Sequence, residues 1–430
     1  MGRRTIDYLN AHRVVTFLAI FLLSFSVRSA ILIHFRGDIL SVGEEPKIAY
    51  ALLAKGQFAD PYAVPTGPTA HSTPFFPVLL AGVYKVLGTG FAGQFGRCML
   101  VVLGYSLLFA LYPTFATAFG FPFEAGLIGG FLSALLPVRR SFEVFRGWEE
   151  SYAGIALGFI LLFTLRRYQS GERSPKTAVW LGLCWGASMY IGFSMFSILA
   201  GLLFVDVLIN RSLRVFMDAC IIMVVTFAVM APWLIRNHEV LHSWTLMRDN
   251  FGMELLLANH DHAHPSAELI YYDPAAMSAF GHPGKSVEEA TLLGQMGEIS
   301  YNRRCTRLAL NWISTHPREF LWLTVQRTAY FWLGPLNHLF EFVITGAYSL
   351  LGLLGLGFIR KHVGTIQFQM WCTTFFFYPL MYYFMVHTTR YRVKIDWMIW
   401  LSAGLVVCVI LEKIAPSWVG SEVRDKSISV

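Results

Sequence analysis

The sequence predicts an all-α membrane protein whose chain crosses the bilayer about ten times. Two observations carry this prediction. Of the 430 residues, 55% are hydrophobic and only 14% are charged, whereas soluble domains carry about 25% charged residues. The mean hydropathy is +0.52, so the charged side chains are too few to coat a water-soluble globule of this length. These values exclude a disordered chain, a coiled coil and a typical cytosolic enzyme.

The formal net charge of +7 does not indicate a nucleic-acid partner. No basic patch interleaved with aromatic residues is present, and the lysines and arginines lie mainly between apolar runs, where they set membrane topology. Six cysteines are scattered without a CxxC pair, five of them within apolar runs. We therefore expect neither a disulfide framework nor a zinc site.

Ten apolar runs approach the roughly 20 residues that one membrane span needs. They lie near 14–35, 95–118, 122–138, 150–166, 178–193, 194–210, 216–235, 338–359, 368–387 and 395–412. A further run at 75–88 is short and contains Lys85, so we expect an interfacial or re-entrant helix there. The stretch 178–210 is the hardest one to divide.

The positions of lysine and arginine predict the orientation of these spans. If the basic N-terminal tail is cytoplasmic, the short segments 119–121, 167–177, 211–215 and 360–367 and the C-terminal tail lie on its side. The segments 36–94 and 236–337 then lie outside, the second being acidic and long enough to escape the charge rule. We expect one membrane domain covering 1–430, with these two segments as its outer elaborations.

The first outer segment contains apolar residues at helical spacing from Glu44 to Lys55, and Pro46 suits a first turn. We expect a helix along the membrane surface, with Glu44 and Glu45 at its start. A carboxylate there contacts both water and lipid headgroups, as a base acting on a lipid-linked substrate requires. The alternative is that both acids only stabilise the helix N-terminus electrostatically.

The second outer turn carries Arg139, Arg140 and Arg146, against the positive-inside rule. An anion such as phosphate is a natural partner for these guanidinium groups. Pairing with nearby glutamates or with ordinary lipid phosphates is an equal alternative. Trp148 follows as a residue that can stack or anchor at the interface, and Glu149 comes next.

The large outer segment begins at Arg236 and contains two further expected helices. A capping-box pattern at Ser286 opens one that runs through Trp312, and Pro317 opens another. The cluster His260, Asp261, His262 and His264 matches no helical ligand spacing, so a solvated loop is favoured over a metal site.

The last outer turn crowds His387, Arg390, Arg392 and Lys394 between two spans. So many cations at a membrane boundary are costly unless they face an anion. With the arginines at 139–146 and Arg236, they are expected to converge on a phosphate or pyrophosphate group.

Four stretches, in this order, carry a resemblance to a known superfamily. They are GEEPKIAYALLAKGQFADPY with PTGPTAHSTPFFPVLLAGVYKVLG; RGWEES; APWLIRNHEVLHSWTLMRDNFGMELLLAN with GEISYNRRCTRLALNWISTHPREFLWLTVQR; and RYRVKID. The chain resembles the GT-C membrane glycosyltransferases, particularly the bacterial branch similar to protein O-mannosyltransferases (glycosyltransferase family 39) and lipid A aminoarabinose transferases. The ordered set covers most of the chain.

This resemblance implies an inverting enzyme of the bacterial plasma membrane, working on its extracytoplasmic side. We expect no cofactor and no metal, and the sequence leaves metal dependence open. It implies a sugar donor carried on a polyprenyl phosphate (undecaprenyl phosphate in bacteria) and a lipid, glycan or protein acceptor. The general base is implied to be Glu44, while Gly43-Glu44-Glu45-Pro46 replaces the Asp-Glu pair of some relatives and leaves Glu45 open.

The resemblance also implies roles for other residues. Glu149 would hold the sugar or the acceptor. The donor phosphate would be held by Arg236, Arg390 and Arg392, with Arg139 and Arg146 as further candidates. Residues expected to line the substrate pocket are Trp148, His71, Asn259 and Tyr391. Ala258 replaces a glycine common in relatives before Asn259, which affects the expected loop geometry.

Two other functions remain open from the sequence. A transporter or lipid-linked sugar flippase would also have many spans and clustered cations, but it would place paired broken helices near the bilayer midplane. A non-catalytic assembly protein is the third reading. Charged residues are few deep within the spans and gather at one face, which favours chemistry at the membrane surface.

Overall fold

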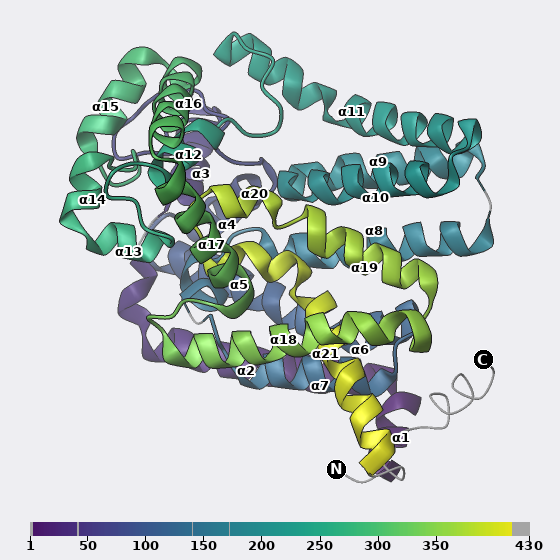
Figure 1. Ribbon diagram of the computed structural model, residues 1–430. Helices are drawn as coiled ribbons and strands as arrows, with labels where there is room; N and C mark the ends of the chain where they lie inside the picture. The colour runs from purple at the N-terminus through teal and green to yellow at the C-terminus, as the bar shows by residue number, and fades with distance from the viewer. Residues whose placement is uncertain (1–2, 41–42, 140, 172, 415–430) are drawn as a thin grey trace.

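The computed structural model describes residues 3–40, 43–139, 141–171 and 173–414, and Figure 1 shows packed helices throughout. Strand-like pairing in these ranges consists of two isolated bridges, Ala59 with Pro68 and Ser266 with His387. The helices of the first half are α1 (Arg3–Ala11), α2 (Arg13–His34), α3 (Glu44–Lys55), α4 (Phe75–Leu87), α5 (Phe91–Ala110), α6 (Tyr112–Phe119), α7 (Phe123–Leu135), α8 (Glu150–Ser170), α9 (Pro175–Ile191) and α10 (Phe196–Asn210). Those of the second half are α11 (Leu213–Leu241), α12 (Phe251–Ala258), α13 (Ala267–Tyr272), α14 (Pro274–Ala279), α15 (Val287–Met296), α16 (Glu298–Thr315), α17 (Pro317–Leu333), α18 (Leu339–His362), α19 (Thr365–Phe377), α20 (Leu380–Phe384) and α21 (Val393–Ile414). Short 3₁₀ helices η1 (Arg36–Leu40), η3 (Phe193–Met195) and η4 (Thr389–Arg392) and the short π-helix η2 (Ser141–Arg146) join some of them.

The fold class predicted from the sequence is confirmed: the chain is an all-α, multi-pass membrane protein. Among the described residues, six helical stretches have the length and hydropathy of spans, namely Arg13–His34, Phe91–Phe119, Phe193–Asn210, Leu213–Leu241, Leu339–His362 and Thr389–Ile414. Each of the other expected spans is also helical, but α7 has only 13 residues and α19 has 13. The count of ten spans therefore stays a prediction.

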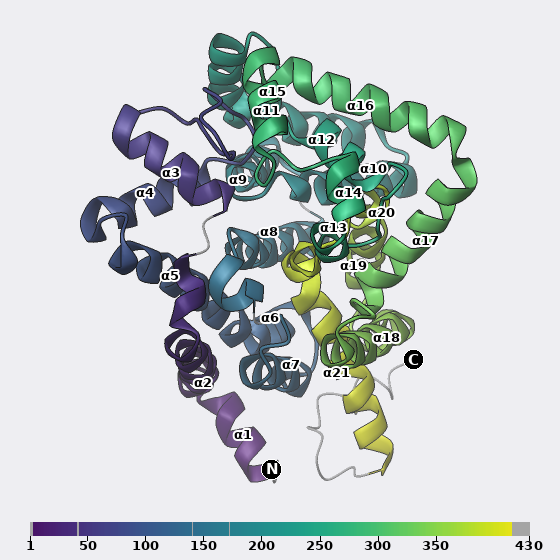
Figure 2. The ribbon, with the colours of Figure 1, turned by 90° about the vertical axis from the view of Figure 1, so that its left-hand side faces the viewer.

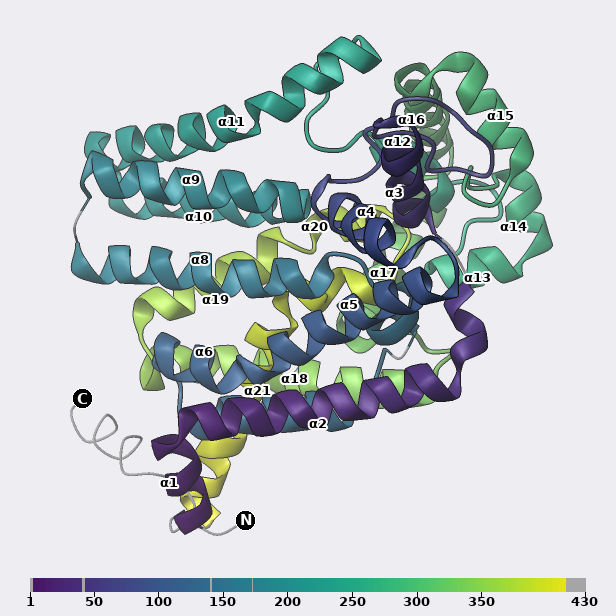
Figure 3. The ribbon, with the colours of Figure 1, turned by 180° about the vertical axis from the view of Figure 1, so that it is seen from behind.

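The connections between long helices alternate between two ends of the bundle. The links α6–α7, α8–α9, α10–α11 and α18–α19 gather at one end together with α1, whereas α3, α4 and α12–α17 gather at the other (Figures 1 and 3). The segments expected to be cytoplasmic thus share one end, and both expected outer segments share the opposite one. The C-terminal tail beyond residue 414 lies outside the described residues.

Most expected elements of the outer segments are present. The surface helix α3 has the expected bounds, Glu44–Lys55, and α17 begins at Pro317. The 178–210 stretch divides at Gly192, between α9 and η3. The expected single helix from Ser286 through Trp312 is wrong: Gly297, with φ of 78°, separates α15 from α16, because only glycine adopts this left-handed backbone without strain.

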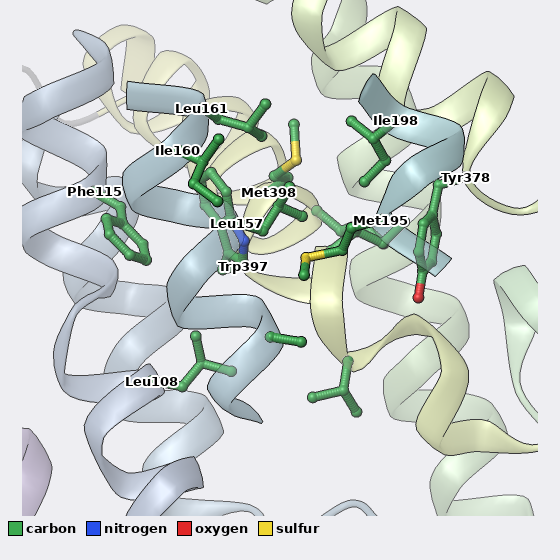
Figure 4. Packing of buried hydrophobic residues seen from close by; sticks show 14 of the residues in the cluster. Leu108, Phe115, Leu157, Ile160, Leu161, Met195, Ile198, Tyr378, Trp397 and Met398 are labelled. Carbon is green, nitrogen blue, oxygen red and sulfur yellow. The ribbon is translucent and has the colours of Figure 1, made fainter. Parts of the chain in front are cut away.

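Figure 4 shows part of the apolar core, in which α21 is packed on several sides. Trp397 and Met398 of α21 lie among Phe115, Leu157 and Ile198 from α6, α8 and α10, and all five are buried. This central helix begins at the end of the bundle that contains α3, α4 and α12–α17, which we call the outer end. The preceding 3₁₀ helix η4 therefore lies at that end, next to a buried helix.

Helix α18 contacts α21 through glycines that leave no space for a side chain. A Cβ atom added at Gly355 would lie 2.3 Å from the carbonyl oxygen of Ser402, whereas one added at Gly357, on the same helix, would meet nothing within 4 Å. Backbone atoms cannot move aside as flexible side chains can, so an alanine at Gly355 would disturb the contact. Gly357 is the matched control position, because an alanine there has free space.

We predict that Gly355→Ala lowers the apparent melting temperature in detergent, because the overpacked interface costs about 1–3 kcal/mol. Gly357→Ala is expected to leave it unchanged or to raise it, since alanine is a better helix former than glycine. Equal melting temperatures for the two variants would contradict this packing of α18 on α21.

Candidate functional site

A cavity of about 510 Å³ lies at the outer end of the bundle. Its lining comes from parts of the chain that are far apart. They are the start of α3, the segment 141–150 that leads into α8, the segments 248–257 and 266–285 with α12 to α14, and the segment 381–394 that leads into α21. Figure 2 looks onto this end, with α3 on one side and α13 and α20 on the other. These segments meet because the connections between the long helices alternate between the two ends of the bundle.

Three glutamates at the starts of two helices are buried beside this cavity. The exposed fraction is 0% for Glu45, 3% for Glu149 and 2% for Glu150. Glu45 lies in the first turn of α3, and Glu149 caps α8, whose first residue is Glu150. The partial positive charge of a helix N-terminus favours carboxylates there, but burial of three of them requires further cations.

Two of these cations come from η4 and from the first turn of α21. The Arg390 guanidinium donates to Glu150 Oε1 at 3.0 Å and stacks on Trp148, with its Cζ atom 3.8 Å from the ring centroid. The Lys394 Nζ atom lies 3.5 Å from Glu149 Oε1. Paired, stacked and desolvated charges of this kind are held in fixed positions.

The carboxyls of Glu45 and Glu149 are driven to different protonation states. Burial raises the pKa of Glu45 well above its usual value, and the charge of Glu149 raises it further. Burial also opposes ionisation of Glu149, but the cations Lys394, Arg248 and Arg390 hold its pKa below the usual value. Glu45 Oε2 is moreover buried without a hydrogen-bond partner. These shifts favour the neutral form of Glu45 and the charged form of Glu149.

Glu44 and Glu45, left equivalent by the sequence, differ in the structure. Glu44 lines the cavity, and Glu45 is buried behind it. The Glu44 Oε1 atom lies 3.9 Å from Nδ1 of His282. Gly284 is packed so closely that an added Cβ would lie 2.4 Å from Glu44 Oε1. The carboxylate that can meet a ligand is therefore that of Glu44.

Residues 69–72, which we name the strap, are clamped from the large outer segment. The Arg236 guanidinium donates to the carbonyl oxygen of Thr69 at 2.7 Å. The Glu298 carboxyl is hydrogen-bonded to the Thr69 hydroxyl, and Ala70 N donates to Glu298 Oε1 at 2.7 Å. Burial raises the pKa of Glu298 to about 8, although these hydrogen bonds act in the opposite direction.

The second half of the strap connects this clamp to the glutamates. The backbone N–H of Asp249 donates to the carbonyl of Ala70 at 2.8 Å, and Arg248 Nε donates to that of His71 at 2.9 Å. The Ser72 hydroxyl donates to Glu45. The strap thus fixes the position of Arg248 and supports Glu45 from behind.

Three of the arginines predicted to hold phosphate do not line the cavity. Arg392 is buried and bonds Asp396 Oδ1 at 2.7 Å, and Arg139 bonds Asp396 Oδ2 at 2.6 Å, so both neutralise one buried aspartate. Arg236 faces the strap and the carbonyl of Phe58. The sequence predicted that these arginines converge on an anion, and this prediction is corrected. Their guanidinium groups already bind buried carboxylates or backbone carbonyls inside the protein.

Of the other residues predicted for the site, some line the cavity and Asn259 does not. The cavity lining includes Arg146, Arg390, Trp148, His71 and Tyr391. Asn259 does not belong to it, since its amide donates to the carbonyls of Leu255 and Phe384 inside the outer segment. Arg140 lies outside the described residues.

Sequence reasoning missed Arg248, Glu150 and His282, which all line the cavity. Glu150 adjoins the predicted Glu149, so the acidic pair at the start of α8 was a usable signal. Nothing in the sequence around Arg248 or His282 indicates that their loops fold back onto the strap and α3.

Within the described ranges, no group of three or more His, Cys, Asp or Glu side chains is arranged to hold a metal ion. In the histidine cluster of the large loop, Nε2 of His264 lies 2.7 Å from Asp273 Oδ2. Asp261 accepts instead from the indole of Trp312 at 2.8 Å.

Comparison with known proteins finds no matching family model and no matching curated protein. Solved structures are similar. The Archaeoglobus fulgidus oligosaccharyltransferase tethered to an acceptor peptide containing the NVT sequon is 16% identical, with a TM-score of 0.51 over 97% of this chain and 53% of that one. Its apo form is 14% identical, with a TM-score of 0.50 over 97% and 52%.

A third structure is AglB, the same organism's oligosaccharyltransferase, in complex with an inhibitory peptide and a dolichol-phosphate. It is 16% identical, with a TM-score of 0.51 over 98% of this chain and 52% of that one. The chain spans about half the length of these proteins. At this level of identity the similarity shows the fold alone, which this chain shares with these oligosaccharyltransferase structures.

The raised pKa of Glu298 predicts a pH-dependent stability. Because native Glu298 keeps its proton up to about pH 8, while an unfolded glutamate loses it near pH 4.3, its contribution to stability falls as the pH rises between these values. Arg236 and Asp249 are the charged groups that face it and act in opposite directions.

We expect the apparent melting temperature of the native protein to fall relative to that of Glu298→Gln between pH 5 and pH 8. The glutamine keeps the acceptor for Ala70 N and has no proton to lose. Melting curves of both proteins across this range test the prediction, and a constant difference would contradict it.

Proposed function

We propose that this chain is a glycosyltransferase that moves a sugar from a polyprenyl-phosphate donor to an acceptor hydroxyl at the extracytoplasmic face. The observation that carries the proposal is one cavity at the outer end of the bundle, in which the Glu44 carboxylate lies with Arg390, Arg248 and Lys394. A base and an anion-binding group are the two parts that such a transfer needs.

The location of the cavity supports a lipid-linked donor. Its lining comes from segments where expected spans end and the helices of the outer segments begin, and lipid headgroups are expected at the ends of spans. The fold supports the same class, since the similar AglB structure holds a dolichol-phosphate. We further propose the family 39 and aminoarabinose-transferase-like branch, in a bacterial plasma membrane with undecaprenyl phosphate as carrier.

The proposed reaction is a single displacement. Glu44 accepts the proton of the acceptor hydroxyl while the oxygen of that hydroxyl forms a bond to the anomeric carbon of the sugar. The bond from that carbon to the phosphate oxygen breaks, and its electron pair leaves with the phosphate. Arg390 and Arg248 stabilise the negative charge that develops on the leaving oxygen. The configuration at the anomeric carbon is inverted.

The buried glutamates position these groups. Glu150 fixes the Arg390 guanidinium at 3.0 Å, and Glu149 lies 3.5 Å from the Lys394 ammonium. Arg248, by contrast, forms no ion pair among the described residues, so its charge remains available to a ligand. We therefore replace Arg236 and Arg392 by Arg248 in the proposed phosphate site.

One observation favours a flippase as second candidate. Two helices are broken beside the cavity, at Gly192 between α9 and α10 and at Pro379 between α19 and α20. Discontinuous helices are typical of transporter sites, but those lie near the bilayer midplane. Here Ser194 and Met381, just after the two breaks, line the same outer cavity.

The base assignment predicts that Glu44→Gln lowers turnover of the purified enzyme by about 10²–10⁴-fold, the usual contribution of a general base. Donor affinity should be nearly unchanged. Glu45→Gln is the matched control, because glutamine mimics the protonated acid, and it should keep most of the activity. Full turnover in Glu44→Gln would refute the assignment.

The phosphate site predicts that Arg248→Gln weakens donor binding by at least tenfold, since a charge-assisted hydrogen bond contributes about 1.5–3 kcal/mol. Arg307→Gln, an exposed arginine on α16, is the control and should bind normally. An unchanged dissociation constant for Arg248→Gln would remove this residue from the site.

Mass spectrometry of lipid that co-purifies with the protein tests the class of donor. We expect a polyprenyl phosphate bearing a sugar, and its conversion to free polyprenyl phosphate on turnover. Movement of the intact lipid across vesicles without this release would support the flippase instead.

A further inference from the structure

Two lysines lie next to Glu44 in the wall of the same cavity. Lys47 follows Glu44 by three residues on α3, so the two side chains share a face of the helix. Lys285 comes from the other side, directly after Gly284, whose backbone packs against the Glu44 carboxylate. Both lysines line the cavity.

Neither lysine forms an ion pair with an acid in the ranges that the structure describes. The Lys47 ammonium donates to the carbonyl oxygen of Tyr62 at 2.8 Å. The exposed Lys285 side chain forms no hydrogen bond or ion pair within the described part of the chain. Burial lowers the pKa of Lys47; Glu44 raises it and Lys285 lowers it again, as expected for two ammonium groups close enough to repel one another.

Their neighbours distinguish these lysines from the proposed donor site. Lys47 shares a face of α3 with Glu44, and Lys285 follows the glycine that packs against the Glu44 carboxylate. Arg390 is instead paired with Glu150. In a single displacement the acceptor approaches the anomeric carbon opposite the leaving phosphate, and the base contacts the acceptor. With the phosphate held by Arg390 and Arg248, the lysines lie on the acceptor side.

Resting on the proposed function, we propose that the acceptor is an anionic molecule whose phosphate or carboxylate group binds Lys47 and Lys285, next to the hydroxyl that Glu44 deprotonates. Two ammonium groups from separate elements suit an anion that accepts from both, and such an anion would relieve their mutual repulsion. A neutral acceptor would leave this repulsion uncompensated.

Lipid probes test the acceptor class. The full chain in phosphatidylcholine nanodiscs is titrated with phosphatidylglycerol, which carries hydroxyls beside a phosphate, with soluble glycerol phosphate, and with neutral diacylglycerol. Lys47→Gln and Lys285→Gln should each weaken phosphatidylglycerol binding roughly tenfold, equivalent to about 1.4 kcal/mol. Lys85→Gln, an exposed lysine on α4 outside the cavity, should have no effect.

The two sources of the anion give different results. Binding of glycerol phosphate with the same lysine dependence indicates that the headgroup alone is recognised, whereas binding of phosphatidylglycerol alone indicates a membrane lipid. The inference is overturned if both lysine variants bind phosphatidylglycerol as the native protein does, or if the native protein binds diacylglycerol equally well.

Hydrolysis of the sugar donor by water separates this inference from the proposed function. It needs Glu44 and the phosphate site but no anionic acceptor, so Lys47→Gln and Lys285→Gln should retain it. Absence of donor turnover in every protein, native included, would contradict the glycosyltransferase and leave the lysine-dependent binding to be judged by the titrations.

Discussion

The outer end of this molecule depends on the neutralisation of buried carboxylates. Glu45, Glu149 and Glu150 are almost fully buried where two helices begin. Glu150 is paired with Arg390 and Glu149 with Lys394, and burial raises the pKa of Glu45, which favours its neutral form. Removing one partner of such a buried pair leaves an uncompensated charge. The junction of α3, α8 and η4 therefore depends on charge balance as well as on apolar packing.

The strap extends this balance into the large outer segment. Its backbone is bonded to Arg236, Glu298, Asp249 and Arg248, and its Ser72 hydroxyl reaches Glu45. The large outer segment therefore contributes Arg248 to the lining of the cavity. Charges held in fixed positions suit the proposed reaction, because they can stabilise a developing charge without reorganisation.

The similarity to the archaeal oligosaccharyltransferases covers nearly all of this chain but about half of theirs. At 14–16% identity the common feature is the fold. The cavity of this chain holds Glu44 together with several cations. We propose Arg390 and Arg248 for the leaving phosphate, and Lys47 and Lys285 for a charged acceptor.

The sequence by itself determined the membrane class, the positions of the apolar helices, the bounds of α3 and the gathering of polar residues at one end, because hydropathy and helical periodicity are local properties. It could not separate Glu44 from Glu45, nor could it tell that Arg139 and Arg392 share Asp396 while Arg390 is paired with Glu150. Those outcomes depend on which side chains meet across the fold. Only the tertiary structure decided them, since the partners of a buried charge come from segments up to 257 residues apart, as between Arg139 and Asp396.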